Sequence, residues 1–136
     1  MKILVSRCLL GEICRYDAKS VPDASVIALG QEHTLVPVCP EMLGGLPCPR
    51  VPCERAADGR VITEDGTDRT AEYTLGAREA LRVYREEGCE KAILKAKSPS
   101  CGCGLIYDGT FTRTLIEGNG VTAELLLKNG IPVESR

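Results

Sequence analysis

Short apolar segments alternate with helical segments along this chain, and that order restricts the fold more than any other feature. Apolar runs with β-forming residues predict four strands, at 2–6, 33–38, 91–96 and 131–135. The segments between them predict three helices, at 24–30, 70–88 and 121–130. A strand–helix–strand order favours an α/β fold with a mostly parallel sheet, helices on both of its faces, and a Rossmann-like arrangement.

The segment 70–88 carries the clearest helical pattern. Its apolar residues recur every three or four positions, from Tyr73 to Tyr84, and Gly88 follows as a natural stop signal. The preceding stretch, 51–68, is polar and contains two Asp-Gly pairs, which favour turns. We expect that stretch to hold, at most, a small hairpin.

Length and composition indicate one globular domain over 1–136. The chain is 43% hydrophobic and 26% charged, which is typical of a folded protein with a core of its own. Its net charge of -2, without any Lys/Arg-rich run, gives no electrostatic case for binding nucleic acid. No apolar run approaches the ~20 residues that span a bilayer, and charged residues interrupt the N-terminus before a signal-peptide core forms. We therefore expect a cytoplasmic protein without a membrane partner.

Eight cysteines and a single histidine, His33, constrain the chemistry. In a reducing compartment the thiols are expected to be free, catalytic or metal-bound rather than paired in disulfides. There is no CxxC pair, so the zinc ribbon and the thioredoxin-type redox motif are both absent. His33 begins the second predicted strand and is expected at the sheet edge opposite the cysteines.

Three cysteines follow predicted strands. Cys8 comes two residues after the first strand, Cys39 directly after the second, and Cys101 shortly after the third. Ligands of open parallel sheets bind outside the carboxyl ends of the strands. We therefore expect these three thiols, and any site they form, at that edge. The alternative is that each is a small buried hydrophobe, which is a common fate of free cysteine.

Three longer blocks resemble the signature motifs of a known family. They read "SRCLLGEICRYDAKS", "VCPEMLGGLPCPR" and "KSPSCGCGLIYDGTFTRTLIEGNGVTAELLLKNGI". The chain resembles, from Met1 to about Val133, the family long called domain of unknown function 523, whose characterised members are 2-thiouracil desulfidases. The resemblance implies a [4Fe-4S] cluster held by three cysteines, with one iron open to the sulfur of a thiolated base. The resemblance further implies that water replaces that sulfur without net redox change.

The same resemblance assigns the cysteines. "SRCLLG" implies Cys8 as a cluster ligand, "VCPE" implies Cys39 and "SPSCG" implies Cys101. Cys14, in "CRYD", is placed near the site as a less certain ligand or a neighbouring thiol. The other four cysteines are expected not to be ligands: Cys48, Cys53, Cys89 and Cys103. Soft thiolates suit iron–sulfur clusters, and a three-ligand cluster leaves an open metal position.

Two further residues match the family's catalytic positions, Glu41 and Ser98. Glu41 could act as general acid or base, or it could simply be a carboxylate at a helix N-terminus after Pro40. Ser98 could act on substrate, or its hydroxyl could fix the loop before Pro99. Ser100 is close enough in sequence to be confused with it.

Two rival functions stay open from the residues alone. The first is a non-catalytic Cys₄ zinc or metal site made of Cys8, Cys14, Cys39 and Cys101. The second is a thiol oxidoreductase that uses Cys101 and Cys103, although a one-residue spacing gives a strained disulfide. The leading hypothesis is an enzyme that takes sulfur from a small thiolated base such as 2-thiouracil, with no nucleic-acid partner.

Overall fold

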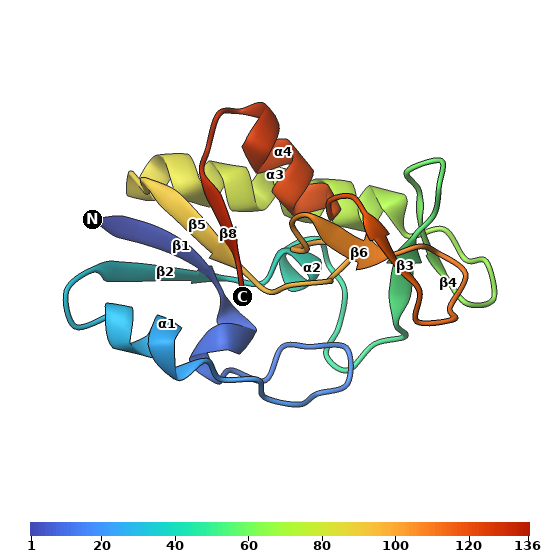
Figure 1. Cartoon of the computed structure of the whole chain (residues 1–136), viewed down its shortest axis with the longest axis horizontal. Coiled ribbons are helices and arrows are strands. Elements are labelled where there is room, and N and C mark those ends of the chain that lie inside the picture. The colour runs from blue at the N-terminus through green and yellow to red at the C-terminus, as the bar shows by residue number, and fades with distance from the viewer.

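The computed structural model describes all 136 residues and has a four-stranded sheet at its centre. The strands lie in the order β2-β1-β5-β8, and every neighbouring pair is parallel (Figure 1). Their bounds are β1 Lys2–Ser6, β2 Thr34–Val38, β5 Lys91–Leu94 and β8 Val133–Ser135. The predicted α/β fold with a parallel sheet is confirmed, and the four predicted strands are present with ends shifted by no more than two residues.

Helices cover both faces of this sheet. Helices α3 (Thr70–Glu87) and α4 (Val121–Lys128) lie on one face, and α1 (Ala24–Leu29) with the 3-10 segment η1 (Arg7–Leu10) lies on the other (Figure 1). Side chains of β1 alternate between the two cores, as the twofold period of a strand requires. Leu4 packs in the cluster that contains Leu126, whereas Ile3 packs in the cluster that contains Val26. No helix is long and apolar enough to cross a membrane.

Smaller elements gather beyond the carboxyl ends of the strands. A single helical turn, α2 (Pro40–Leu43), follows β2, and two hairpins lie further along: β3 (Cys53–Arg55) with β4 (Val61–Thr63), and β6 (Leu105–Tyr107) with β7 (Leu115–Glu117) (Figure 1). The first hairpin agrees with the expectation for the polar stretch. The second was not predicted, because its strands have only three residues each within a glycine-rich loop.

Candidate functional site

A cleft of about 490 Å³ lies at the carboxyl edge of the sheet. Its walls come from the segments that follow β1, β2 and β5, and from residues of both hairpins. This is the edge at which open parallel sheets bind their ligands. His33 lies away from it, before β2 at the amino end of the sheet, as expected from the sequence.

The three cysteines that follow strands all line this cleft. Cys8 lies in η1 directly after β1, Cys39 precedes the turn α2 after β2, and Cys101 lies in the loop after β5. Their exposed fractions are 6%, 8% and 5%, so the thiols are buried against the cleft floor. Strand ends that are distant in sequence have brought three soft donors into one cavity.

Cys14 joins this group. It is 2% exposed and lines the cleft, and its thiol is hydrogen-bonded to those of Cys8 and Cys39. Cys39 also donates to the carbonyl oxygen of Cys14, at 3.7 Å. The bond with Cys14 lowers the pKa of Cys8 and raises the pKa of Cys39. For Cys14, the bond with Cys39 lowers the pKa, but the bond with Cys8 and burial outweigh it and raise the pKa to about 11.

Cys101 is buried like these thiols, at 5% exposed. Burial raises its pKa to about 12, against a smaller opposing contribution from hydrogen bonding to Ser6. The negative charges of Cys39 and Glu41 raise it further, so Cys101 is electrostatically coupled to the other groups of the cleft. The thiols of the cleft therefore influence one another's pKa values. The four involved are Cys8, Cys14, Cys39 and Cys101.

Positive side chains surround the thiols. Six of the lining residues are cationic: Arg7, Arg15, Arg50, Lys95, Lys97 and Arg113. Only two lining residues are acidic, Glu41 and Glu54. This excess of positive charge offsets the negative charge that several thiolates would place in a buried cleft. The pKa of Cys8 is already lowered in part by the charge of Lys95.

Glu41 lies in the first turn of α2, at the cleft wall, and its carboxylate is held by two partners. The phenol of Tyr73 donates to Oε2 at 2.6 Å. Arg50 donates from Nε to Oε2 at 3.2 Å, and its Nη2 lies 3.2 Å from Oε1. The side chains of Arg50 and Glu41 are 6% and 16% exposed, so this is a buried, forked ion pair.

Arg50 also ties separate segments together. Its Nη1 donates to the carbonyl oxygens of Cys14, at 2.9 Å, and Pro47, at 3.1 Å. One guanidinium therefore links the loop after β1, the turn α2 that carries Glu41, and the loop before β3. The sequence did not single out Arg50 or Tyr73, although Arg50 closes the block "VCPEMLGGLPCPR" and that position was the available signal.

The structure separates the two serines of the loop after β5. Ser98 lines the cleft, and its Oγ accepts hydrogen bonds from the backbone N–H groups of Ser100 and Cys101, both at 3.0 Å. Ser100 is fully buried and bonded to the hydroxyl of Thr122 at 2.9 Å, away from the cleft. Ser98 therefore fixes the turn that presents Cys101, and it keeps a hydroxyl hydrogen of its own to donate.

Among the four cysteines expected not to be ligands, Cys53 alone lines the cleft. It begins β3 and its thiol is hydrogen-bonded to Tyr73 rather than to the other cleft cysteines. Cys48 is bonded to the carbonyl oxygen of Arg15 at 3.2 Å, outside the cleft lining. No group of three or more His, Cys, Asp or Glu side chains is arranged to hold a single metal ion.

Comparison with known proteins agrees with this site. The profile of a family described as 2-thiouracil desulfurase matches residues 3–136. An uncharacterized protein of Bacillus subtilis (strain 168), YbbK, is 40% identical over an alignment 142 residues long. The alignment covers 98% of this chain and 94% of YbbK. A solved structure described as the [4Fe-4S]-dependent thiouracil desulfidase TudS is 46% identical, with a TM-score of 0.92 over 99% of this chain and 90% of that one.

The family match spans almost the whole chain, and the likeness of the solved structure is equally complete. The resemblance read from the three sequence blocks is therefore confirmed. The expectations of an iron–sulfur enzyme and a [4Fe-4S] cofactor agree with the description of the solved relative. On this evidence, the chain belongs to the 2-thiouracil desulfurase family.

Proposed function

We propose that this protein is a [4Fe-4S]-dependent desulfidase that acts on a small thiolated heterocycle such as 2-thiouracil. In the reaction, water and the C=S group give C=O and hydrogen sulfide, with no net oxidation or reduction. The observation that carries the proposal is the meeting of three buried thiols, from three strand ends, beside one fixed carboxylate. The 46% identity to a [4Fe-4S]-dependent thiouracil desulfidase supports it.

The residues of the cleft fit such a cluster. Cys8, Cys39 and Cys101 would hold it, because thiolates are the usual ligands of iron–sulfur clusters and these three line one cavity. The surrounding Arg and Lys side chains compensate the negative charge of the thiolates. Cys14 touches two of the proposed ligands, unlike Cys53, and is therefore the further cleft thiol best placed to bind as well. When bound through three protein ligands, the cluster supplies a Lewis-acid iron with an open position for a soft sulfur donor.

The chain's own residues then handle protons and orientation. Glu41, with a carboxylate held at the cleft wall by Arg50 and Tyr73, takes a proton from the attacking water and returns one to the departing sulfur. Ser98 donates its remaining hydroxyl hydrogen to the heterocycle while its Oγ keeps the turn before Cys101 in place.

The non-catalytic zinc site considered from the sequence has less support. A structural zinc ion needs four ligands that meet at one point in a tetrahedral arrangement. The side chains of this cleft are not grouped to hold a single ion. A cluster contains several iron atoms, so its cysteines need not meet at one point. The arrangement therefore favours the cluster over the zinc ion.

The proposal is tested by purifying the protein without oxygen and supplying iron and sulfide. The loaded protein should be brown, with broad absorption and about four irons and four labile sulfides per chain. Sulfide release is then measured from a panel of heterocycles, each compared with its oxygen analogue as a blank. A colourless protein with one zinc per chain, or a loaded cluster that releases no sulfide from any thiolated base, would overturn the proposal.

A further inference from the structure

The donors around Glu41 are distributed unequally between its two oxygens. Oε2 accepts from both Tyr73 Oη and Arg50 Nε, whereas Oε1 has only Arg50 Nη2 beside it. Each carboxylate oxygen offers about two acceptor positions. Oε2 is therefore fully used by the protein, and Oε1 keeps one position for a water molecule or a substrate atom. Tyr73 makes the difference between the two oxygens.

The place of Tyr73 is set by the backbone. Tyr73 is 1% exposed and lies one helical turn before Gly76, at which α3 crosses α2. A Cβ atom on Gly76 would lie 1.9 Å from the carbonyl oxygen of Pro40, and one on Gly44 would lie 2.0 Å from that of Glu72. The two glycines let the helices touch backbone to backbone. The backbone contact between α2 and α3 therefore fixes the positions from which the side chains of Tyr73 and Glu41 meet.

Tyr73 is also a constant donor. Burial, followed by the negative charge of Glu41, raises the pKa of the Tyr73 phenol far above its usual range. The phenol therefore keeps its proton at neutral pH and remains a donor. The thiol of Cys53, the first residue of β3, also contacts this phenol. The phenol nevertheless donates its hydrogen bond to Glu41.

We propose that Tyr73 is the positioning residue of Glu41: it fixes Oε2, so that Oε1 is the oxygen that exchanges protons during desulfuration. This inference rests on the proposed function. Tyr73 does not line the cleft and reaches the site through its bond to Glu41. Its loss leaves a carboxylate held by Arg50 alone, with one free acceptor position on each oxygen, so that Oε1 is no longer distinguished from Oε2 when the attacking water binds. The expected consequence is slower turnover with unchanged substrate binding.

The test is Tyr73→Phe, which removes only the hydroxyl, measured on cluster-loaded protein with 2-thiouracil. We expect kcat to fall about 10- to 100-fold, as for other groups that orient a reacting ligand, and KM to stay within about two-fold. Iron content and the cluster spectrum should equal those of the unchanged protein. The matched control is Tyr84→Phe, because Tyr84 is a buried tyrosine of the same helix and packs away from the cleft. It should leave every one of these values unchanged.

A double-mutant cycle distinguishes positioning from packing. If the hydroxyl acts through Glu41, adding Tyr73→Phe to Glu41→Gln should change kcat by less than about two-fold. If the turnover of Glu41→Gln is too low to measure, the coupling between the two side chains is obtained from the free energies of unfolding of the two single variants and the double variant. Additive effects, a normal kcat for Tyr73→Phe, or loss of iron in that variant would each overturn the inference while leaving the proposed function intact. Absence of sulfide release by the unchanged loaded protein would overturn the proposed function and this inference with it.

Discussion

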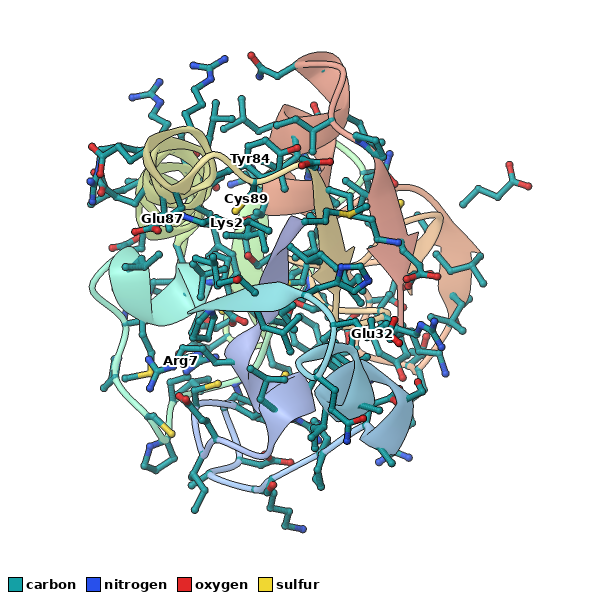
Figure 2. The ribbon with its side chains drawn as sticks, turned by 90° about the vertical axis from the view of Figure 1, so that its left-hand side faces the viewer. Lys2, Arg7, Glu32, Tyr84, Glu87 and Cys89 are labelled. Atoms are coloured by element: carbon teal, nitrogen blue, oxygen red, sulfur yellow. The ribbon has the colours of Figure 1, made fainter.

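Each end of the sheet has a buried cysteine and a buried tyrosine of helix α3, and the cleft with the proposed ligands lies at the carboxyl end. At the carboxyl end, Cys39 and Tyr73 are both linked to the segment around Glu41. At the amino end, Cys89 lies beside Tyr84, with Lys2 and Glu87 close by (Figure 2). The exposed fractions are similar, at 8% for Cys39 and 9% for Cys89.

The difference lies in the partners of these side chains. The hydroxyl of Tyr73 donates to a carboxylate that is also paired with a buried arginine. Tyr84 and Cys89 instead pack in the hydrophobic cluster between the sheet, α3 and α4. Burial of a cysteine or a tyrosine thus says little about function by itself. What distinguishes the carboxyl end is that loops after parallel strands bring several such groups together around one cavity.

The strongest test of this difference replaces one cysteine at each end of the sheet with serine. Cys39→Ser should lose iron and sulfide release together, because it removes one of three thiolates proposed to anchor the cluster. Cys8→Ser and Cys101→Ser should behave alike. The matched control, Cys89→Ser, should keep both iron and turnover. Iron and labile sulfide per chain, measured beside turnover, decide the matter, and a Cys39→Ser protein with a full cluster would contradict the ligand assignment.

The second largest effect is expected from Glu41→Gln. This change keeps the shape and some hydrogen bonding of the side chain but removes its charge and its ability to carry a proton. Turnover should fall roughly 10²–10⁴-fold, the range of general acid–base catalysis, with the cluster intact. Ser98→Ala should lower turnover less, because in the proposed mechanism the hydroxyl orients the heterocycle and holds the turn before Cys101 but carries no proton between water and sulfur.

The control for Glu41 is Glu124, which pairs with the partly buried Arg55 outside the cleft. Glu124→Gln should cost some stability and leave turnover of the folded protein unchanged. Near-full turnover of Glu41→Gln with an intact cluster would reduce Glu41 to a carboxylate at a helix start. Iron loss as severe as in the cysteine variants would make it a ligand or a structural residue.

A smaller effect on turnover, but a clear one on stability, is expected from Gly76→Ala. A methyl group there would meet the backbone of Pro40, which no side-chain rotation can relieve. Overpacking of this kind costs about 1–3 kcal/mol, more than the ~1 kcal/mol that Ala gains over Gly inside a helix. We expect a lower midpoint of thermal unfolding and reduced turnover, because α2 and Glu41 move away from Tyr73. Arg78→Ala, on the exposed side of α3, is the control and should change little.

Much of the fold could be predicted from the sequence because strand and helix patterns alternate in order. Cys8, Cys39 and Cys101 could be placed at one edge for the same reason, since the carboxyl ends of parallel strands share an edge. The hairpin β6–β7 could not be predicted, because each strand has three residues and all of β7 is exposed. Such short strands are specified by neighbours in space and not by a pattern along the chain.

The partners of Glu41 were missed for a related reason. Tyr73 occupies an apolar position of the α3 pattern and is indistinguishable, in sequence, from a core residue such as Tyr84. Its bond partner lies 32 residues away. Only the close crossing at Gly44 and Gly76 brings the phenol to the carboxylate, and glycine in a helical pattern does not say which backbone approaches it.

A finer test concerns the fourth thiol of the cleft. Cys14→Ser should keep most of the iron, because a hydroxyl can still hydrogen-bond to the neighbouring thiolates of Cys8 and Cys39. We expect a change in the electron paramagnetic resonance spectrum of the reduced cluster and a several-fold change in turnover at most, since bonds to ligand sulfurs tune a cluster. Iron loss equal to that of Cys8→Ser would instead make Cys14 a ligand, and the three-cysteine arrangement would be wrong.

The smallest effect is expected at Cys103, two residues after a proposed ligand. Cys103 does not line the cleft and packs, half-buried, against the cluster between α3 and α4. Cys101 belongs to the same cluster but also lines the cleft, whereas Cys103, like Cys89, does not, although the sequence places Cys103 beside Cys101. Cys103→Ser should leave iron content and sulfide release within about two-fold, because Cys103 is only half-buried and does not line the cleft, so that the new hydroxyl can bond to water. Thiol titration under oxidising and reducing conditions should give no Cys101–Cys103 disulfide in the loaded protein. Loss of sulfide release in Cys103→Ser, with the cluster intact, would revive the oxidoreductase alternative and show that sequence proximity to Cys101 matters more than position around the cleft.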